Sequence, residues 1–283
     1  MAPNFLRDHL RRHETKRRKV WVEAPVRKCL YCSSADGSFE GEEHAVPRAF
    51  GADADRFVIP PGGVCDRCNE WLGAEVDGPF VARFDVQLTR GLEQMTNRRG
   101  KLPDLIEGRE PKGELLLDID GARVKLLSSA VATPDGGLDI ELRPVVRDPE
   151  DIVARTIRAL WKIALGAMYL SDAVSALDRR WDHLRHAVLG APFQGYLLQL
   201  PFRASRSGHL RISVDVNQPE SPVAMVFSLG GLGLALPIAP GASLPAKTAI
   251  DAGWEVHPSS ERPRHVIRLR LDPDDNRDSR DGH

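Results

Sequence analysis

The sequence predicts an α+β protein in which a small cysteine-containing domain precedes a larger domain of mixed strands around a helical hairpin. Three observations lead to this prediction. All four cysteines lie between residues 29 and 68, in a short segment punctuated by glycine and proline. Apolar residues recur at the helical period after residue 150. Alternating apolar segments separated by turn signals lie on both sides of that helix.

The composition supports a globular chain. It has 283 residues, 42% hydrophobic and 28% charged, which is enough apolar material for a core and favours about two domains. The longest apolar run, 229–239, has eleven residues with three glycines and a proline, whereas a membrane-spanning helix needs about twenty. No apolar segment of a secretory signal follows the basic N-terminus. We therefore expect a cytoplasmic protein without membrane contact, whose cysteines form no disulfides.

Charge is unevenly distributed at the two ends of the chain. Residues 1–28 contain nine basic and three acidic residues, although the whole chain has a net charge of −1. Residues 1–25 are predicted to be a basic helix or arm, which could lie along nucleic-acid phosphates or be a solvated helix. Residues 272–283 contain five aspartates and no large apolar residue, so we expect a disordered tail.

The cysteines form two Cys-x-x-Cys pairs separated by thirty-two residues, Cys29 with Cys32 and Cys65 with Cys68. Each such turn can direct two sulfurs at one tetrahedral ion, and two turns complete a shell of four thiolates. A closed shell leaves no position for water, so the pattern predicts a structural Zn²⁺ that joins two loops. Two pairs without a βαβ pattern disfavour a redox role. A zinc ribbon that only binds a partner stays open.

The larger domain is predicted over residues 102–271. Asp120-Gly121 is a hairpin signal between strands at 114–119 and 122–127, and a further strand is expected at 138–145. Apolar residues at 153, 157, 160, 161, 164 and 168 mark a helix. Its partner is predicted over 171–189, ending at Gly190, and later strands at 196–202, 209–216 and 223–229.

A more specific motif lies between and just after the cysteine pairs. The segment 41–51 reads Gly-Glu-Glu-His-Ala-Val-Pro-Arg-Ala-Phe-Gly, and the second pair continues directly into Asn69 and, eight residues later, Asp77. This combination resembles the HNH endonuclease superfamily, in the branch with two zinc knuckles, Glu-His-x-x-Pro-Arg and Cys-x-x-Cys-Asn. The resemblance covers roughly residues 26–85. It implies that residues 26–95 form a ββα-metal domain.

The resemblance also implies roles for individual residues. Glu43 and Asp77 would hold a catalytic divalent cation, His44 would be the general base, and Asn69 would position the histidine ring or its loop. The chemistry agrees with these roles, because an imidazole can take a proton from water near neutral pH. A hard cation held by carboxylates can neutralise the leaving oxygen, and two carboxylates suit Mg²⁺ or Mn²⁺.

Some alternatives stay open. Glu42 would replace Glu43 if the strand register shifted by one residue, and Glu70 and Glu75 compete with Asp77 as ligands. The wider superfamily commonly has Asp or His before the catalytic histidine and His or Asn as the last letter, where this chain has Glu and Asp, so an inactive copy is conceivable.

The sequence thus predicts a metal-dependent endonuclease that hydrolyses DNA, with RNA not excluded. The basic arm and the segment with Arg98, Arg99 and Lys101 would contact substrate phosphates, and Arg48 would contact phosphate or pair with an acid. The rival prediction is a non-catalytic zinc-stabilised module that binds nucleic acid or a protein partner.

Overall fold

The computed structural model describes residues 24, 26–93, 95, 151–200, 210–221, 223–239 and 254–260, together with the backbone of strands at 114–119, 122–132, 138–143 and 267–271. Helices and antiparallel sheets alternate in no repeating order, which confirms the predicted α+β class. The predicted basic arm apart from residue 24, the segment 98–101 and the tail at 272–283 lie outside the described residues.

The cysteine-containing part consists of short elements. They are β1 (Glu43–His44), the 3-10 segment η1 (Arg48–Arg56), β2 (Val58–Ile59), α2 (Asp66–Leu72), the π-helical turn η2 (Gly73–Asp77), α3 (Gly78–Ala82) and α4 (Phe84–Leu92). Strands β1 and β2 pair antiparallel, with Glu43 opposite Ile59 and His44 opposite Val58. The helical backbone continues from α2 through η2 into α3, where a proline occupies the first turn. Asp77 therefore lies at the end of a π turn, a feature often found at functional sites.

In the described part of the remaining chain, the strands form two antiparallel sheets. The five-stranded sheet has the order β10-β6-β9-β8-β7 and the four-stranded sheet the order β11-β5-β4-β3. Their strands are β3 (Glu114–Ile119), β4 (Ala122–Ala132), β5 (Leu138–Arg143), β6 (Tyr196–Gln199), β7 (Arg211–Val214), β8 (Met225–Leu229), β9 (Leu232–Leu236), β10 (Glu255–Pro258) and β11 (Ile267–Leu271). The predicted hairpin at Asp120-Gly121 is confirmed by the pairing of β3 with β4.

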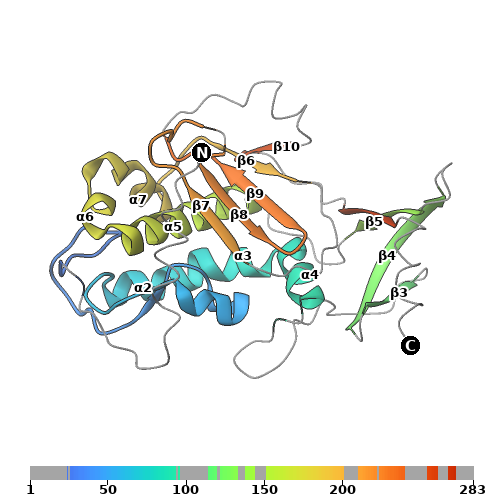
Figure 1. The fold of residues 1–283 in the computed structure, drawn as a ribbon, viewed down its shortest axis with the longest axis horizontal. Helices are drawn as coiled ribbons and strands as arrows, with labels where there is room; N and C mark the ends of the chain where they lie inside the picture. The colour runs from blue at the N-terminus through green and yellow to red at the C-terminus, as the bar shows by residue number, and fades with distance from the viewer. Residues whose placement is uncertain are drawn as a thin grey trace, which may run out of the picture.

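Helix α5 (Ile152–Ser171) is the central element of the described fold. It runs between the α2–α3 helices and the sheet that contains β7, β8 and β9 (Figure 1). Fifteen of its twenty residues are buried, so apolar residues are needed on almost every side of it. Gly166 allows a close approach to β1, because a Cβ at this position would lie 2.3 Å from the Cβ of Ala45.

The predicted second helix of the hairpin is wrong as one continuous element. Residues 171–189 are divided into α6 (Ala173–Ala176), the 3-10 turn η3 (Arg179–Trp181) and α7 (Asp182–Val188). Two aspartates cause the division, because Asp172 accepts hydrogen bonds from the backbone of Val174 and Ser175, and Asp178 accepts one from Arg180. Such side-chain caps begin new helical segments. The predicted end is correct, with Gly190 at φ +99°.

Sequence reasoning missed strands β9, β10 and β11. All five residues of β9 are buried, so this strand lacks the alternation of apolar and polar residues that identifies a half-exposed strand. One hydrophobic core includes residues from the cysteine-containing part, from α5 and from the five-stranded sheet. Within the described part of the chain, no helix has the length and apolar composition needed to cross a membrane.

Candidate functional site

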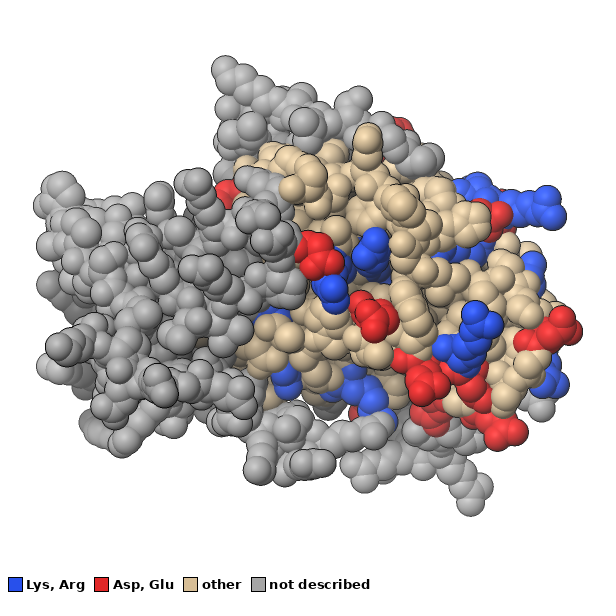
Figure 2. Space-filling model, turned by 180° about the vertical axis from the view of Figure 1, so that it is seen from behind, with Lys and Arg blue, Asp and Glu red and all other residues tan. Residues whose placement is uncertain are grey.

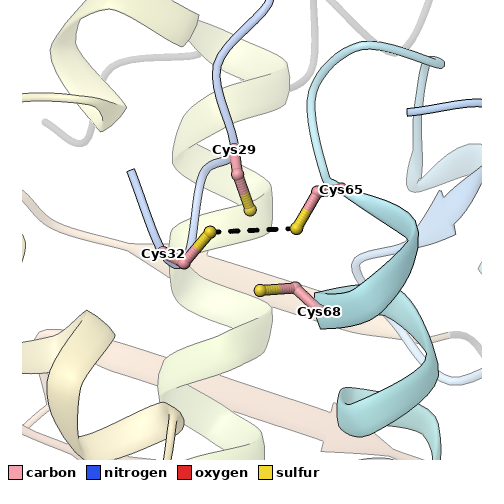
Figure 3. Close-up of side chains that lie close together, drawn as sticks. All are labelled: Cys29, Cys32, Cys65 and Cys68. Atoms are coloured by element: carbon pink, nitrogen blue, oxygen red, sulfur yellow. Dashed lines mark hydrogen bonds between the residues drawn. The ribbon is translucent and has the colours of Figure 1, made fainter. Parts of the chain in front are cut away.

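The four cysteines come together from two loops. Cys29 and Cys32 flank one tight turn, while Cys65 precedes α2 and Cys68 lies in its first turn. Their four sulfurs lie within 4.8 Å of one another, and the Sγ atoms of Cys32 and Cys65 are 3.8 Å apart (Figure 3). Sulfurs about 2.3 Å from a central zinc ion would be about 3.8 Å apart in a tetrahedron. The cluster can therefore hold a metal ion such as zinc.

The electrostatics of the cysteine cluster favour a thiolate. A hydrogen bond from Cys68 lowers the pKa of the Cys29 thiol to about 5, against the opposing effect of burial. The pKa of Cys68 is raised, chiefly because it donates that hydrogen bond. A bound cation would stabilise the thiolate form of the ligands further.

Buried polar contacts connect the cysteine cluster to the rest of the molecule. Arg185 of α7 is 1% exposed and donates from Nε to the carbonyl of Leu30, between the first two cysteines, at 2.8 Å. The same guanidinium binds Asp182 at 2.5 Å. The first cysteine turn is therefore fixed to the helices that follow α5, although 155 residues separate the two partners.

Helix α2 also fixes the segment that leads into β1. Asp66 accepts a hydrogen bond from the backbone N–H of Gly41 at 2.8 Å, and Asn69 donates from Nδ2 to the carbonyl of Glu42 at 2.9 Å. The resemblance implies that Asn69 positions the histidine ring or its loop. Its hydrogen bond is to the loop, directly before Glu43 and His44.

The carboxylates of Glu43 and Asp77 converge on one point, which is occupied by the ammonium group of Lys162. The Nζ atom of this α5 residue lies 2.7 Å from Glu43 Oε1 and 2.8 and 3.0 Å from the two carboxylate oxygens of Asp77. It also donates to the carbonyl of His44 at 2.6 Å. These four residues are hereafter called the Lys162 cluster. The side chains of Lys162, Glu43 and Asp77 are 0%, 4% and 20% exposed.

Burial and charge oppose each other in the Lys162 cluster. Burial raises the pKa of Glu43 and of Asp77, although Lys162 partly counteracts the rise. Burial disfavours the charged form of Lys162, but the two carboxylates outweigh it and its pKa is raised. A buried ammonium flanked by two carboxylates stays protonated, because each carboxylate stabilises the charge at close range.

The imidazole of His44 has different surroundings. Successive side chains of an extended strand point to opposite faces, and the His44 ring lies with Nε2 3.6 Å from Asp55 of η1. Its side chain is 11% exposed. Burial lowers the pKa of His44, and the nearby Arg48 adds to this effect. The lowered pKa favours the neutral imidazole, which is the form that can accept a proton.

The expected catalytic cation does not fit the arrangement of these residues. Glu43 and Asp77 do meet, as a shared ligand role requires, but both bind Lys162, and a second cation there would face the ammonium charge at short range. Among the described residues, the four cysteines are the one group of three or more His, Cys, Asp and Glu whose ligand atoms gather closely. The structure thus places Glu43 and Asp77 around an ammonium group, and their role as ligands of a divalent cation remains a prediction.

The alternative residues are placed differently. Glu70 and Glu75 are exposed on the outside of the helical segment, whereas Asp77 faces inward, and Glu43 rather than Glu42 is buried. Sequence reasoning missed Lys162, although a signal was present. It is the one charged residue in the apolar stretch 159–170, and a lysine inside a buried helix requires a partner.

The comparisons with known proteins give no relative. No family model, no curated protein and no solved structure matches the chain. The resemblance to HNH endonucleases therefore depends on the motif residues, and a function has to be argued from the geometry.

Proposed function

We propose that the four cysteines bind one structural zinc ion. The supporting observation is the convergence of four sulfurs from two loops at distances that suit tetrahedral zinc. Because all four ligands are protein thiolates, the ion would have no open position for a substrate. Its role would be to hold the loop at Cys29 against helix α2.

We further propose that the chain is an endonuclease that hydrolyses DNA phosphodiester bonds, with His44 as general base on an HNH-type ββα unit formed by β1, β2 and α2. The observation that carries this proposal is the hydrogen bond from Asn69 to the carbonyl of Glu42. Through it, the helix that begins at the second cysteine pair positions the strand that carries His44. The placement of Asn69 directly after Cys68 would then serve to hold the strand that carries His44.

The lowered pKa of His44 is suited to this role. A neutral imidazole can take a proton from the attacking water as its oxygen bonds to phosphorus. The bond from phosphorus to the leaving oxygen then breaks, and that oxygen takes a proton from solvent. A positioned general base contributes about 10²- to 10⁴-fold to a rate. Arg48, exposed in η1 and close enough to affect the imidazole, would offer its guanidinium to a substrate phosphate. The proposal includes no step through a divalent cation, because Lys162 occupies the position between Glu43 and Asp77.

Cleavage of supercoiled plasmid by the purified, zinc-loaded protein tests the proposal. Wild type should nick or linearise plasmid, and His44→Ala should lose about 10²-fold or more of that activity. His186→Ala is the matched control, because His186 is exposed on α7. Equal cleavage by wild type and His44→Ala would contradict the role of His44. Cleavage of RNA but not plasmid would contradict DNA as the substrate.

A second candidate function is a non-catalytic zinc-stabilised module that binds nucleic acid or a protein partner. The observation that favours it is the engagement of both carboxylates by Lys162, while the His44 ring lies beside Asp55. In the described part of the face shown in Figure 2, basic and acidic side chains are interspersed. Binding of plasmid with equal affinity by wild type and His44→Ala, without cleavage by either, would favour this candidate.

A further inference from the structure

The Lys162 ammonium has the coordination of a resident cation. An ammonium group has three N–H donors. The Nζ atom donates hydrogen bonds to the carbonyl of His44 and to the carboxylate of Asp77, and it forms an ion pair with Glu43 Oε1 at 2.7 Å. All three partners belong to the segment 43–77, while the lysine comes from a helix more than eighty residues later. The cation therefore arrives with α5 when the two parts of the chain pack together.

The packing of α5 against β1 explains how the ammonium reaches this position. Residues four apart lie on the same face of a helix, so Lys162 shares a face with Gly166. Gly166 touches Ala45, the residue after His44, so closely that a Cβ would clash. One turn away, the lysine ammonium contacts the carbonyl of His44 in β1 and the carboxylates of Glu43 and Asp77. Its position is thus set by backbone packing as well as by charge.

We propose that Lys162 takes the place of a divalent cation between Glu43 and Asp77, so that this centre binds no Mg²⁺ or Mn²⁺ while the lysine is present. The same oxygens cannot bind both the ammonium group and a divalent ion, and the two positive charges would repel each other at this distance. Removal of the ammonium group leaves two converging carboxylates and a backbone carbonyl, which are the hard oxygen ligands that Mn²⁺ and Mg²⁺ prefer. Lys162→Ala would thus create a cation site.

Binding of Mn²⁺ to the full-length, zinc-loaded protein tests this inference without reference to cleavage. For wild type, electron paramagnetic resonance should show that all added Mn²⁺ stays free in solution. Thermal denaturation of wild type should give the same Tm with and without Mn²⁺. Lys162→Ala should bind one Mn²⁺ and gain Tm with it, because an ion that binds the folded state stabilises that state. Lys162→Ala combined with Asp77→Asn is the matched control and should lose both effects.

The outcomes separate the possibilities. Binding of Mn²⁺ by wild type that is lost in Glu43→Gln would overturn the inference, and so would a folded Lys162→Ala that binds none. If Lys162→Ala is unfolded without metal, Mn²⁺ should restore its folding, and failure to do so would also count against the inference. One corollary rests on the proposed function: plasmid cleavage should proceed without added Mg²⁺ or Mn²⁺. A protein that does not cleave would contradict the nuclease proposal but leave the Mn²⁺ result unaffected.

Discussion

Two buried ion clusters link α5 or its neighbours to the cysteine-containing part, and they differ in charge balance. In the Lys162 cluster, one cation faces two carboxylates. In the other, Arg83 faces the single carboxylate of Asp85 through two contacts of 2.8 and 2.5 Å, and also donates to Thr156 of α5 and Gln199 of β6. Both Arg83 and Asp85 are 2% exposed or less. We call this group the Arg83 cluster.

The difference indicates different purposes for the two clusters. Among the described residues, the Arg83 cluster pairs one guanidinium with one carboxylate, and both ions are hydrogen-bonded, which is the arrangement that makes a buried ion pair tolerable. The Lys162 cluster has two carboxylates for one ammonium group next to the strand of His44, and the side chain of Asp77 is 20% exposed. The first cluster is explained by packing alone. The second cluster arranges two carboxylates and a backbone carbonyl around the ammonium group that, in our proposal, takes the place of a divalent ion.

The largest expected effect is loss of the proposed zinc ion, which would disrupt both clusters. Because the proposed zinc joins the Cys29 loop to α2, its removal should unfold the segment that carries Glu43, Asp77 and Arg83. Structural zinc contributes about 10–16 kcal/mol in small zinc domains. Cys68→Ser should reduce both the helical circular dichroism signal and the amount of zinc bound per protein, measured by mass spectrometry. A chelator that removes zinc from the side of the exposed Cys32 should have the same two effects. Full retention of the spectrum in metal-free protein would contradict the structural role.

Lys162→Met should have the next largest effect. It leaves two buried carboxylates without their cation, and loss of one partner of a buried ion pair costs about 3–5 kcal/mol. Urea denaturation should show this loss. Glu43→Gln together with Asp77→Asn should recover most of it, and either change alone should recover less. Full recovery by one neutralisation would show that the second carboxylate carries no charge in the wild type.

Arg83→Met should cost a similar amount, about 3–5 kcal/mol, for the same reason. The comparison predicts a different pattern of recovery, because in the described part of the chain Arg83 faces one carboxylate, that of Asp85. Asp85→Asn alone should restore most of the stability that Arg83→Met removes. Neither variant should bind Mn²⁺, since a single carboxylate is left. A need for a second neutralisation would show that the two clusters are not distinguished by charge balance.

The cost of Lys162→Met should decrease in acid. Burial raises the pKa of Glu43 and Asp77, and Lys162 opposes the rise, so without the lysine both values should rise further above those of the unfolded chain. The folded variant then binds more protons than the unfolded chain and gains relative stability as the pH falls through these values. We expect a smaller difference from wild type at about pH 5 than at about pH 8 in urea denaturation. A larger difference in acid would contradict this charge model.

Asn69→Ala should have the smallest effect on stability. Its hydrogen bond to the carbonyl of Glu42 is neutral and partly buried, and such a bond contributes about 1 kcal/mol. If it positions the His44 strand, plasmid cleavage should fall much more than stability. Asn69→Asp tests the direction of the bond, because a carboxylate cannot donate to a carbonyl. Unchanged cleavage in a folded Asn69→Ala would remove the observation on which the nuclease proposal depends.

The sequence by itself determined the local features of this protein. Short-range geometry decides the spacing within each cysteine pair, the hairpin at Asp120-Gly121, the apolar period of the helix after residue 150 and the end of the helical region at Gly190. The division of the second helical region at Asp172 and Asp178 also depends on local contacts. The apolar period alone does not reveal it, because each aspartate has to be considered separately as an N-cap.

Only the tertiary structure decided what lies between Glu43 and Asp77. The resemblance places these two carboxylates around a metal, and nothing near them in the chain suggests otherwise. The ammonium that occupies the position comes from Lys162, 118 residues after His44, and it arrives because Gly166 lets α5 pack against β1. Contacts between residues so far apart depend on how whole elements pack, and a local pattern carries no information about that packing.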